Sequence, residues 1–225
     1  MKKLFATITP FLVCCLGYGF LSLTTFVISN HLIHVSMVWN LILAIVPLLL
    51  STIALGYKME SWKKVVLLVL WLLFLPNAFY VLTDFIHISD LNYFVGGGYY
   101  NFKNVQYNLD IVNYLELVNI AIGYLLSLAA GLISLRSVFG MTTKKYNKKT
   151  VTVMLGVVFI LIGYAIYIGR FLRLNSWDIL NIPHLVEKIV SGMSLFGVTA
   201  TLLFAGYVAI TYVLFEVVSK VRQKR

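Results

Sequence analysis

The sequence predicts an all-α, polytopic membrane protein with six transmembrane helices in a single integral-membrane domain, residues 1–225. Of its 225 residues, 60% are hydrophobic and only 12% are charged, and the mean hydropathy is +0.91. Soluble domains carry about 25% charged residues, so most of this chain must lie in lipid. A helix needs about 20 apolar residues to cross a bilayer core, and six such helices use most of the length.

Taken in order, the apolar runs give the expected spans. They cover about 9–29, 37–56, 65–86, 111–135, 151–171 and 189–217, and the longest loop is the aromatic and glycine-rich stretch 88–110. The third run contains Pro76, which has no amide hydrogen to donate to the carbonyl of Leu72. With Asn77 directly after it, this break places a polar spot near mid-membrane.

Small residues recur every four positions on the fourth and sixth runs. They are Gly123, Ser127 and Gly131 on the fourth and Gly197, Thr201, Ala205 and Ala209 on the sixth. Small side chains at this spacing let helix backbones approach closely in a membrane. We expect these stripes to serve packing.

The basic residues predict the orientation of the spans. Most of the 18 lysines and arginines lie on one side of the expected membrane, together with both termini. They are Lys2, Lys3, Lys58, Lys63, Lys64, Arg136, Lys144, Lys145, Lys148, Lys149, Lys220, Arg222, Lys224 and Arg225. Positive loops face the cytoplasm, which predicts cytoplasmic termini in a multi-pass protein of the cell (plasma) membrane. The net charge of +10 is spread over short loops beside apolar runs, which argues against nucleic-acid binding.

On the opposite side, the third run carries a polar stripe. Asn77, Tyr80, Asp84 and His87 share one face of a helix, with Thr83 beside them. Three interpretations stay open: an acid–histidine pair for proton transfer, two metal ligands, or a structural pair of Asp84 with an arginine. The metal interpretation needs further ligands, for which His184, His31 and Asp178 are weak candidates.

Two further stripes extend this polar region. Glu116 and Asn119 share a face of the fourth run, and a charged glutamate there needs a basic partner or water. Arg170 and Arg173 are one turn apart at the end of the fifth run. Either the arginines form an ion-pair network with Asp84, Glu116 and Asp178, or they bind the anionic head of a lipid or lipid-linked envelope precursor.

Two segments together resemble a known family. They are PNAFYVLTDFIHI (Pro76–Ile88) and GRFLRLNSWDIL (Gly169–Leu180). They are similar to the PNAxYxxTDxxH and GRxLRxNSWD patterns of a bacterial and archaeal family of multi-pass membrane proteins of unknown function. Phe79 stands where that family often has a proline. The resemblance implies an integral membrane protein and brings no substrate, reaction or cofactor.

From these stripes we expect an outward-facing polar pocket between the third, fourth and fifth spans. Its expected residues are Asn77, Tyr80, Thr83, Asp84, His87, Glu116, Asn119, Arg170, Arg173, Asn175, Trp177 and Asp178. The leading hypothesis is a non-enzymatic cell-envelope protein that binds a lipid or a partner there. The alternatives are a proton-coupled transporter of a small solute or lipid, and a membrane-embedded hydrolase or transferase that uses Asp84 and His87. No cofactor is expected, and the oligomeric state stays open.

Overall fold

The computed structural model describes residues 2–91, 93–95, 106–143, 145–174 and 181–223. Almost all of them are helical, which confirms the all-α class. The elements are α1 (Lys2–Ser29), α2 (Ile33–Gly56), α3 (Ser61–Phe74), α4 (Pro76–Tyr80), the 3₁₀ helix η1 (Val81–Asp90), β1 (Phe94–Val95), β2 (Gln106–Tyr107), α5 (Ile111–Thr142), α6 (Lys148–Phe171), α7 (Ile182–Ser191) and α8 (Leu195–Gln223). The two strands pair antiparallel and lie within the long loop expected at 88–110, of which 96–105 fall outside the described residues.

Six helical stretches of the described chain are long and apolar enough to cross a membrane, as the sequence predicts. They are Ile8–Ser29, Ile33–Gly56, Ser61–Ser89, Ile111–Thr142, Lys148–Phe171 and Leu195–Val221. The second span starts four residues before the expected position 37 and therefore includes His34. This earlier start matters for the site described below.

The third span is built from three pieces, α3, α4 and η1. Pro76 occupies the first turn of α4, where a missing amide hydrogen costs little. From Val81 onward the chain is a 3₁₀ helix, in which side chains three residues apart lie above one another. The polar residues that were expected to share one helical face therefore point in different directions. Thr83 follows Tyr80, whereas Asp84 is rotated by about 120° from Tyr80.

The expected sixth span, 189–217, needs a correction, because its first residues belong to another helix. Ile189 lies in α7, a short amphipathic helix that starts at the Asn181 cap, where Asn181 Oδ1 accepts from the His184 amide at 3.4 Å. Helix α7 ends at the Gly192 cap. At the start of α8, Ser194 Oγ accepts a hydrogen bond from the Gly197 amide at 3.1 Å. Asn181 and Ser194 are thus side-chain caps of the type that commonly begins an α-helix.

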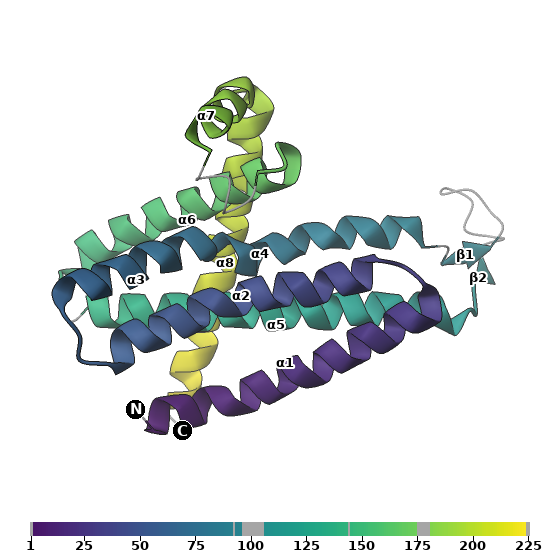
Figure 1. Cartoon of the computed structure of the whole chain (residues 1–225), viewed down its shortest axis with the longest axis horizontal. Coiled ribbons are helices and arrows are strands. Elements are labelled where there is room, and N and C mark those ends of the chain that lie inside the picture. Colours follow the sequence, from purple (N-terminus) through teal and green to yellow (C-terminus); the bar gives the residue numbers. More distant parts are fainter. Residues whose placement is uncertain (1, 92, 96–105, 144, 175–180, 224–225) are drawn as a thin grey trace.

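In Figure 1, α1, α2, α3, α5 and α6 run along the long axis of the molecule, while α8 crosses them. The most extensive contacts join α6 to α8 and α2 to α5. Gly163 on α6 makes the first contact possible, because a Cβ there would collide with the Thr201 carbonyl and the Ala205 backbone. The small residues on the sixth span therefore serve close packing, as expected.

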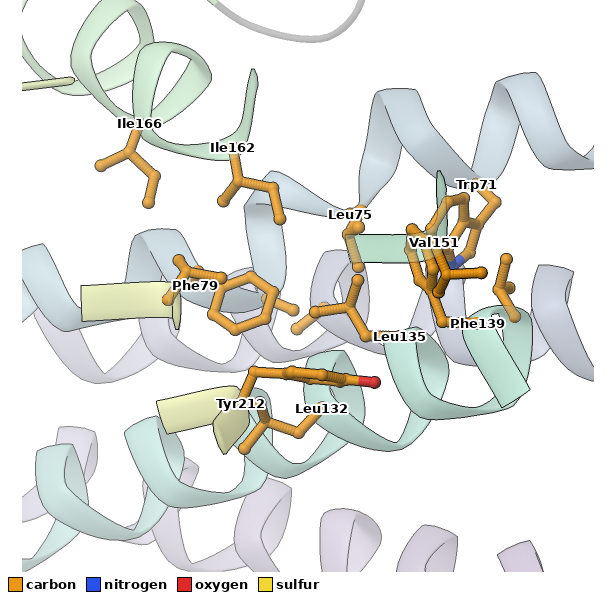
Figure 2. Packing of buried hydrophobic residues seen from close by; sticks show 14 residues of the cluster. Trp71, Leu75, Phe79, Leu132, Leu135, Phe139, Val151, Ile162, Ile166 and Tyr212 are labelled. Atoms are coloured by element: carbon orange, nitrogen blue, oxygen red, sulfur yellow. The ribbon is translucent and has the colours of Figure 1, made fainter. Parts of the chain in front are cut away.

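The main apolar core joins α3 and α4 to α5, α6 and α8, and Figure 2 shows its side chains from close by. Phe79 and Leu75 are fully buried there beside Leu135 of α5 and Ile162 of α6. Gly131 lets α5 approach this region closely, since a Cβ there would lie 2.8 Å from Ala78. The core thus fixes α4, and with it the polar residues that follow α4.

Candidate functional site

The first polar cluster surrounds Asp84, which is only 2% exposed. Asn40 of α2 donates from Nδ2 to Asp84 Oδ2 at 2.7 Å, and Arg170 of α6 lies 3.5 Å from Asp84 Oδ1. Arg170 also donates to the Thr83 carbonyl at 3.1 Å and to the Tyr80 hydroxyl at 3.5 Å. Asp84 therefore links α2, η1 and α6, and the expected structural pairing of Asp84 with an arginine is confirmed.

The second polar cluster surrounds Glu116, which is also 2% exposed, on α5. Its Oε2 lies 2.8 Å from Nδ1 of His31 and 3.1 Å from Nε2 of His34. The other ring nitrogen of His34 lies 3.1 Å from Asn119 Oδ1, which also accepts from the Tyr18 hydroxyl at 3.2 Å. The basic partners of Glu116 are thus histidines from the start of α2, where the sequence pointed to arginines.

The two clusters lie on different faces of α2. His34 and Asn40 are six residues apart, which rotates their side chains by about 120° relative to each other on an α-helix. Met37, Val81 and Ile120 form a buried apolar group together between α2, η1 and α5. The expected pocket residues that form these clusters are therefore divided between them, with Tyr80, Thr83, Asp84 and Arg170 in the first and Glu116 and Asn119 in the second.

A cavity of about 330 Å³ adjoins the Asp84 cluster. Its polar lining comes from Asn40, Asn77 and Tyr80, and its apolar lining includes Trp39, Leu43, Leu73, Pro76, Ala165, Ile168, Leu174, Leu185 and Ile189. Leu185 and Ile189 belong to α7, which therefore covers one side of the cavity. The described lining carries no charged side chain.

A second, apolar cavity of about 330 Å³ adjoins the first and lies between α3 and α6. The two share Leu73, Pro76 and Ala165 in their linings. The rest of the second lining is apolar apart from Tyr164 and consists of Val69, Leu72, Leu161 and Ile162. The two adjoining cavities therefore differ in character: polar groups line part of the first, and almost only apolar groups line the second.

The remaining expected residues lie apart from the cavity lining. His87 lies half-buried on η1, and Arg173 is exposed with a positive φ of 56° after the end of α6. His184 is exposed on α7. Asn175, Trp177 and Asp178 lie outside the described residues. Among the residues that the structure describes, no three His, Cys, Asp or Glu side chains are arranged to hold a metal ion.

Sequence reasoning missed several residues of the site, above all His34 and Asn40. Both residues lie on α2, which starts at Ile33. The corresponding span was expected to start at 37, so His34 was left outside it. The signal was present on the first run as well, where Tyr18, Ser22 and Thr25 share one helical face and are all buried. Asn119 contacts all three, at 3.2, 3.1 and 3.4 Å respectively.

Comparison with known proteins supports the family indicated by the sequence. A family model described as "Protein of unknown function (DUF1361)" matches residues 39–219. No curated protein and no solved structure matches the chain. The matched region includes three of the six apolar helices completely, most of two others, and the whole Asp84 cluster. Because the match covers most of its length, the chain belongs to the DUF1361 family of proteins of unknown function.

Proposed function

We propose that this protein is a non-enzymatic membrane protein that binds a lipid, with the lipid head in the polar cavity and an acyl chain in the apolar one. The observation that carries the proposal is that two cavities of different polarity adjoin and share Leu73, Pro76 and Ala165 in their linings. A partly polar cavity beside an apolar one matches the two parts of an amphiphile. The two cavities, of about 330 Å³ each, suit a small head and part of a chain.

The direction of the apolar cavity supports a lipid over a water-soluble ligand. The apolar cavity reaches from Pro76 to Val69, seven residues along the third span, or about 10 Å of helix rise. On α6 it reaches back from Ala165 to Leu161. The apolar cavity therefore runs along the helices, in the direction that acyl chains take in a bilayer.

The hydrogen-bonding groups of the cavity favour an uncharged, hydroxyl-bearing head. Asn40 uses its Nδ2 for Asp84, which leaves its carbonyl oxygen as an acceptor. Tyr80 accepts from Arg170 and can still donate its own proton. A hydroxyl group has both complementary parts, a donor for the Asn40 oxygen and an acceptor for the Tyr80 proton. The charge of Arg170 is offset by Asp84, so a phosphate head finds less support here than the sequence suggested.

We further propose that both termini are cytoplasmic and that the polar cavity opens toward the outer side of the cell membrane. The lysine-rich connections before α3 and before α6 support this orientation. In this orientation the apolar cavity points toward the cytoplasmic side. Labelling of single cysteines placed at Lys58 and at Leu109 with an impermeant reagent tests it: only the second should react in intact cells.

Native mass spectrometry of the purified full chain tests lipid binding. Ala165→Leu fills the junction of the two cavities and should lower the retained lipid by about tenfold, the change that ~1.4 kcal/mol produces. Gly156→Leu is the matched control on α6, because nothing lies within 4 Å of a Cβ there. Equal lipid retention by both variants would contradict the proposal, and a retained lipid with a phosphate head would contradict the uncharged head.

The transporter and enzyme hypotheses both assign chemistry to Asp84. Its two carboxylate oxygens are occupied by Asn40 and Arg170, which supports a structural role. Lipid binding requires no change in these bonds. It is therefore the function that the described geometry supports best.

A further inference from the structure

The hydrogen-bonded network around Glu116 carries an inference that is independent of the lipid cavity. A continuous chain of contacts leads from His31 through Glu116 to His34 and Asn119. Along it the exposed fraction of the side chain falls from 57% at His31 to 3% at Glu116 and 0% at His34. The chain thus connects the surface, at the turn between α1 and α2, with a fully buried imidazole.

The orientation of the Asn119 side chain indicates whether Nδ1 of His34 donates or accepts a hydrogen bond. The amide nitrogen of Asn119 faces Thr25 Oγ1 at 3.4 Å, and its oxygen accepts from the Tyr18 hydroxyl at 3.2 Å. That carbonyl oxygen can only accept a hydrogen bond. Ser22 also donates to this oxygen at 3.1 Å, and a hydrogen bond from His34 to it, at 3.1 Å, places a proton on Nδ1 of His34.

The other side of the His34 ring needs a second proton. Nε2 of His34 lies 3.1 Å from Oε2 of Glu116, and a hydrogen bond there requires one proton between the two atoms. If the proton is on nitrogen, the pair is imidazolium and carboxylate. If it is on oxygen, the pair is neutral imidazole and carboxylic acid. In both cases the pair holds the same number of protons and has no net charge.

We infer that His34 and Glu116 together form a proton-binding site, which exchanges its proton with outside water through His31. The shared proton belongs to the pair rather than to either residue. Its loss leaves one net negative charge between α1, α2 and α5, where burial penalises it strongly. His31 supports the path, because its Nδ1 contacts the same carboxylate oxygen while most of its side chain is exposed.

Other titratable groups approach this site from each neighbouring element. Tyr18 of α1 contacts Asn119, and the Tyr114 ring of α5 lies 5.9 Å from the ring of Tyr93. Tyr93, just before β1, is close enough for the Glu116 charge to contribute to the rise in the Tyr93 pKa, after burial. Asp84 is already paired with Arg170, so its carboxylate adds little net charge near the pair.

Nitrogen-15 NMR of the histidine rings and infrared spectroscopy of the full chain test the proton site together. His34 is assigned by His34→Gln, and the carboxylic acid band by Glu116→Gln, with Glu216→Gln as the matched control. We expect one of two results at neutral pH: both His34 nitrogens protonated, or a carboxylic acid band that disappears only in Glu116→Gln.

The proposal is overturned if the wild-type protein shows one bare His34 nitrogen and no carboxylic acid band from Glu116. This outcome needs no variant that might fold poorly. A second measurement addresses the exchange path. His31→Phe should slow deuterium exchange of the shared proton at least tenfold, and His184→Phe, on exposed α7, should not. Equal exchange rates in these two variants would refute the path through His31.

Discussion

Asn40 donates a hydrogen bond of 2.7 Å from its side-chain amide to a carboxylate oxygen of Asp84, which is 44 residues further along the chain. Arg170 approaches the other oxygen of the same carboxylate from α6 at 3.5 Å. A carboxylate that is 2% exposed needs such partners, because burial without them is costly. Asp84 therefore connects α2, η1 and α6 through its side-chain contacts, and the contribution of these contacts to stability can be measured.

A double-mutant cycle tests the interaction between Arg170 and Asp84. Arg170→Gln should destabilise the protein by roughly 3 kcal/mol, because it leaves a buried carboxylate without its cation. Asp84→Asn should cost less and should remove most of the effect of Arg170→Gln when the two are combined. Thermal or denaturant unfolding in detergent measures the three variants. Costs that simply add would show that the two residues do not interact.

The close approach of α6 and α8 gives a second prediction. Gly163→Ala should destabilise the protein by about 1–3 kcal/mol, because its Cβ meets the backbone of Thr201 and Ala205, which cannot move aside easily. Gly156→Ala, on the same helix with nothing within 4 Å, is the control and should be neutral or slightly stabilising. The melting temperatures of the two variants provide the comparison. A Gly163→Ala protein as stable as the control would refute the contact.

A buried hydroxyl of α5 gives a third prediction. Ser134 accepts a hydrogen bond of 2.6 Å from the Trp71 indole and contacts the Pro47 carbonyl at 3.0 Å. Ser134→Ala leaves the buried indole N–H unpaired and should cost about 1–3 kcal/mol. Ser137→Ala, one turn further on, removes only a bond to its own helix, to the Ile133 carbonyl. If both serine variants unfold alike, the Trp71 bond contributes nothing.

Tyr93, in the loop before β1, gives a prediction about how stability depends on pH. The Tyr93 pKa is raised above its ordinary value of 10.0, mainly by burial and then by Glu116 and Tyr114. A raised pKa in the folded state means that the folded protein holds this proton more tightly. The associated stability is therefore present below pH 10.0 and is lost as the pH rises through the folded-state pKa. Melting temperatures should fall less steeply above that pH in Tyr93→Phe than in wild type, whereas Tyr107→Phe, exposed on β2, should behave as wild type.

Sequence patterns predicted the helices well where hydrophobicity alone decides them. Six apolar runs gave six long helices, and the small-residue stripes on the fourth and sixth spans proved to be contact surfaces. The errors arose where capping or backbone detail decides. Asn181 begins α7 and Gly192 ends it before α8, and the 3₁₀ geometry after Tyr80 rotates Asp84 away from the expected face.

The candidate site was predictable by residue type and only partly by partner. The sequence offered Arg170 and Arg173 as partners for Asp84, because a carboxylate in a membrane helix needs a cation, and the structure pairs Asp84 with Arg170. The pairing of Glu116 with His31 and His34 could not be predicted, because three helices must be placed before their polar faces can be compared. The cavity beside Asn40 likewise depends on how α2, α4, α6 and α7 pack.

Composition and periodicity by themselves determined that this chain is a helical membrane protein with polar groups concentrated at a few depths. Lipid solvation acts on each residue separately, so hydropathy read along the chain is sufficient for that conclusion. The tertiary structure alone decided which polar groups meet, because hydrogen bonds are short and directional. Asn40 reaches Asp84, and His34 reaches Glu116, only once the helices have docked in one particular rotation.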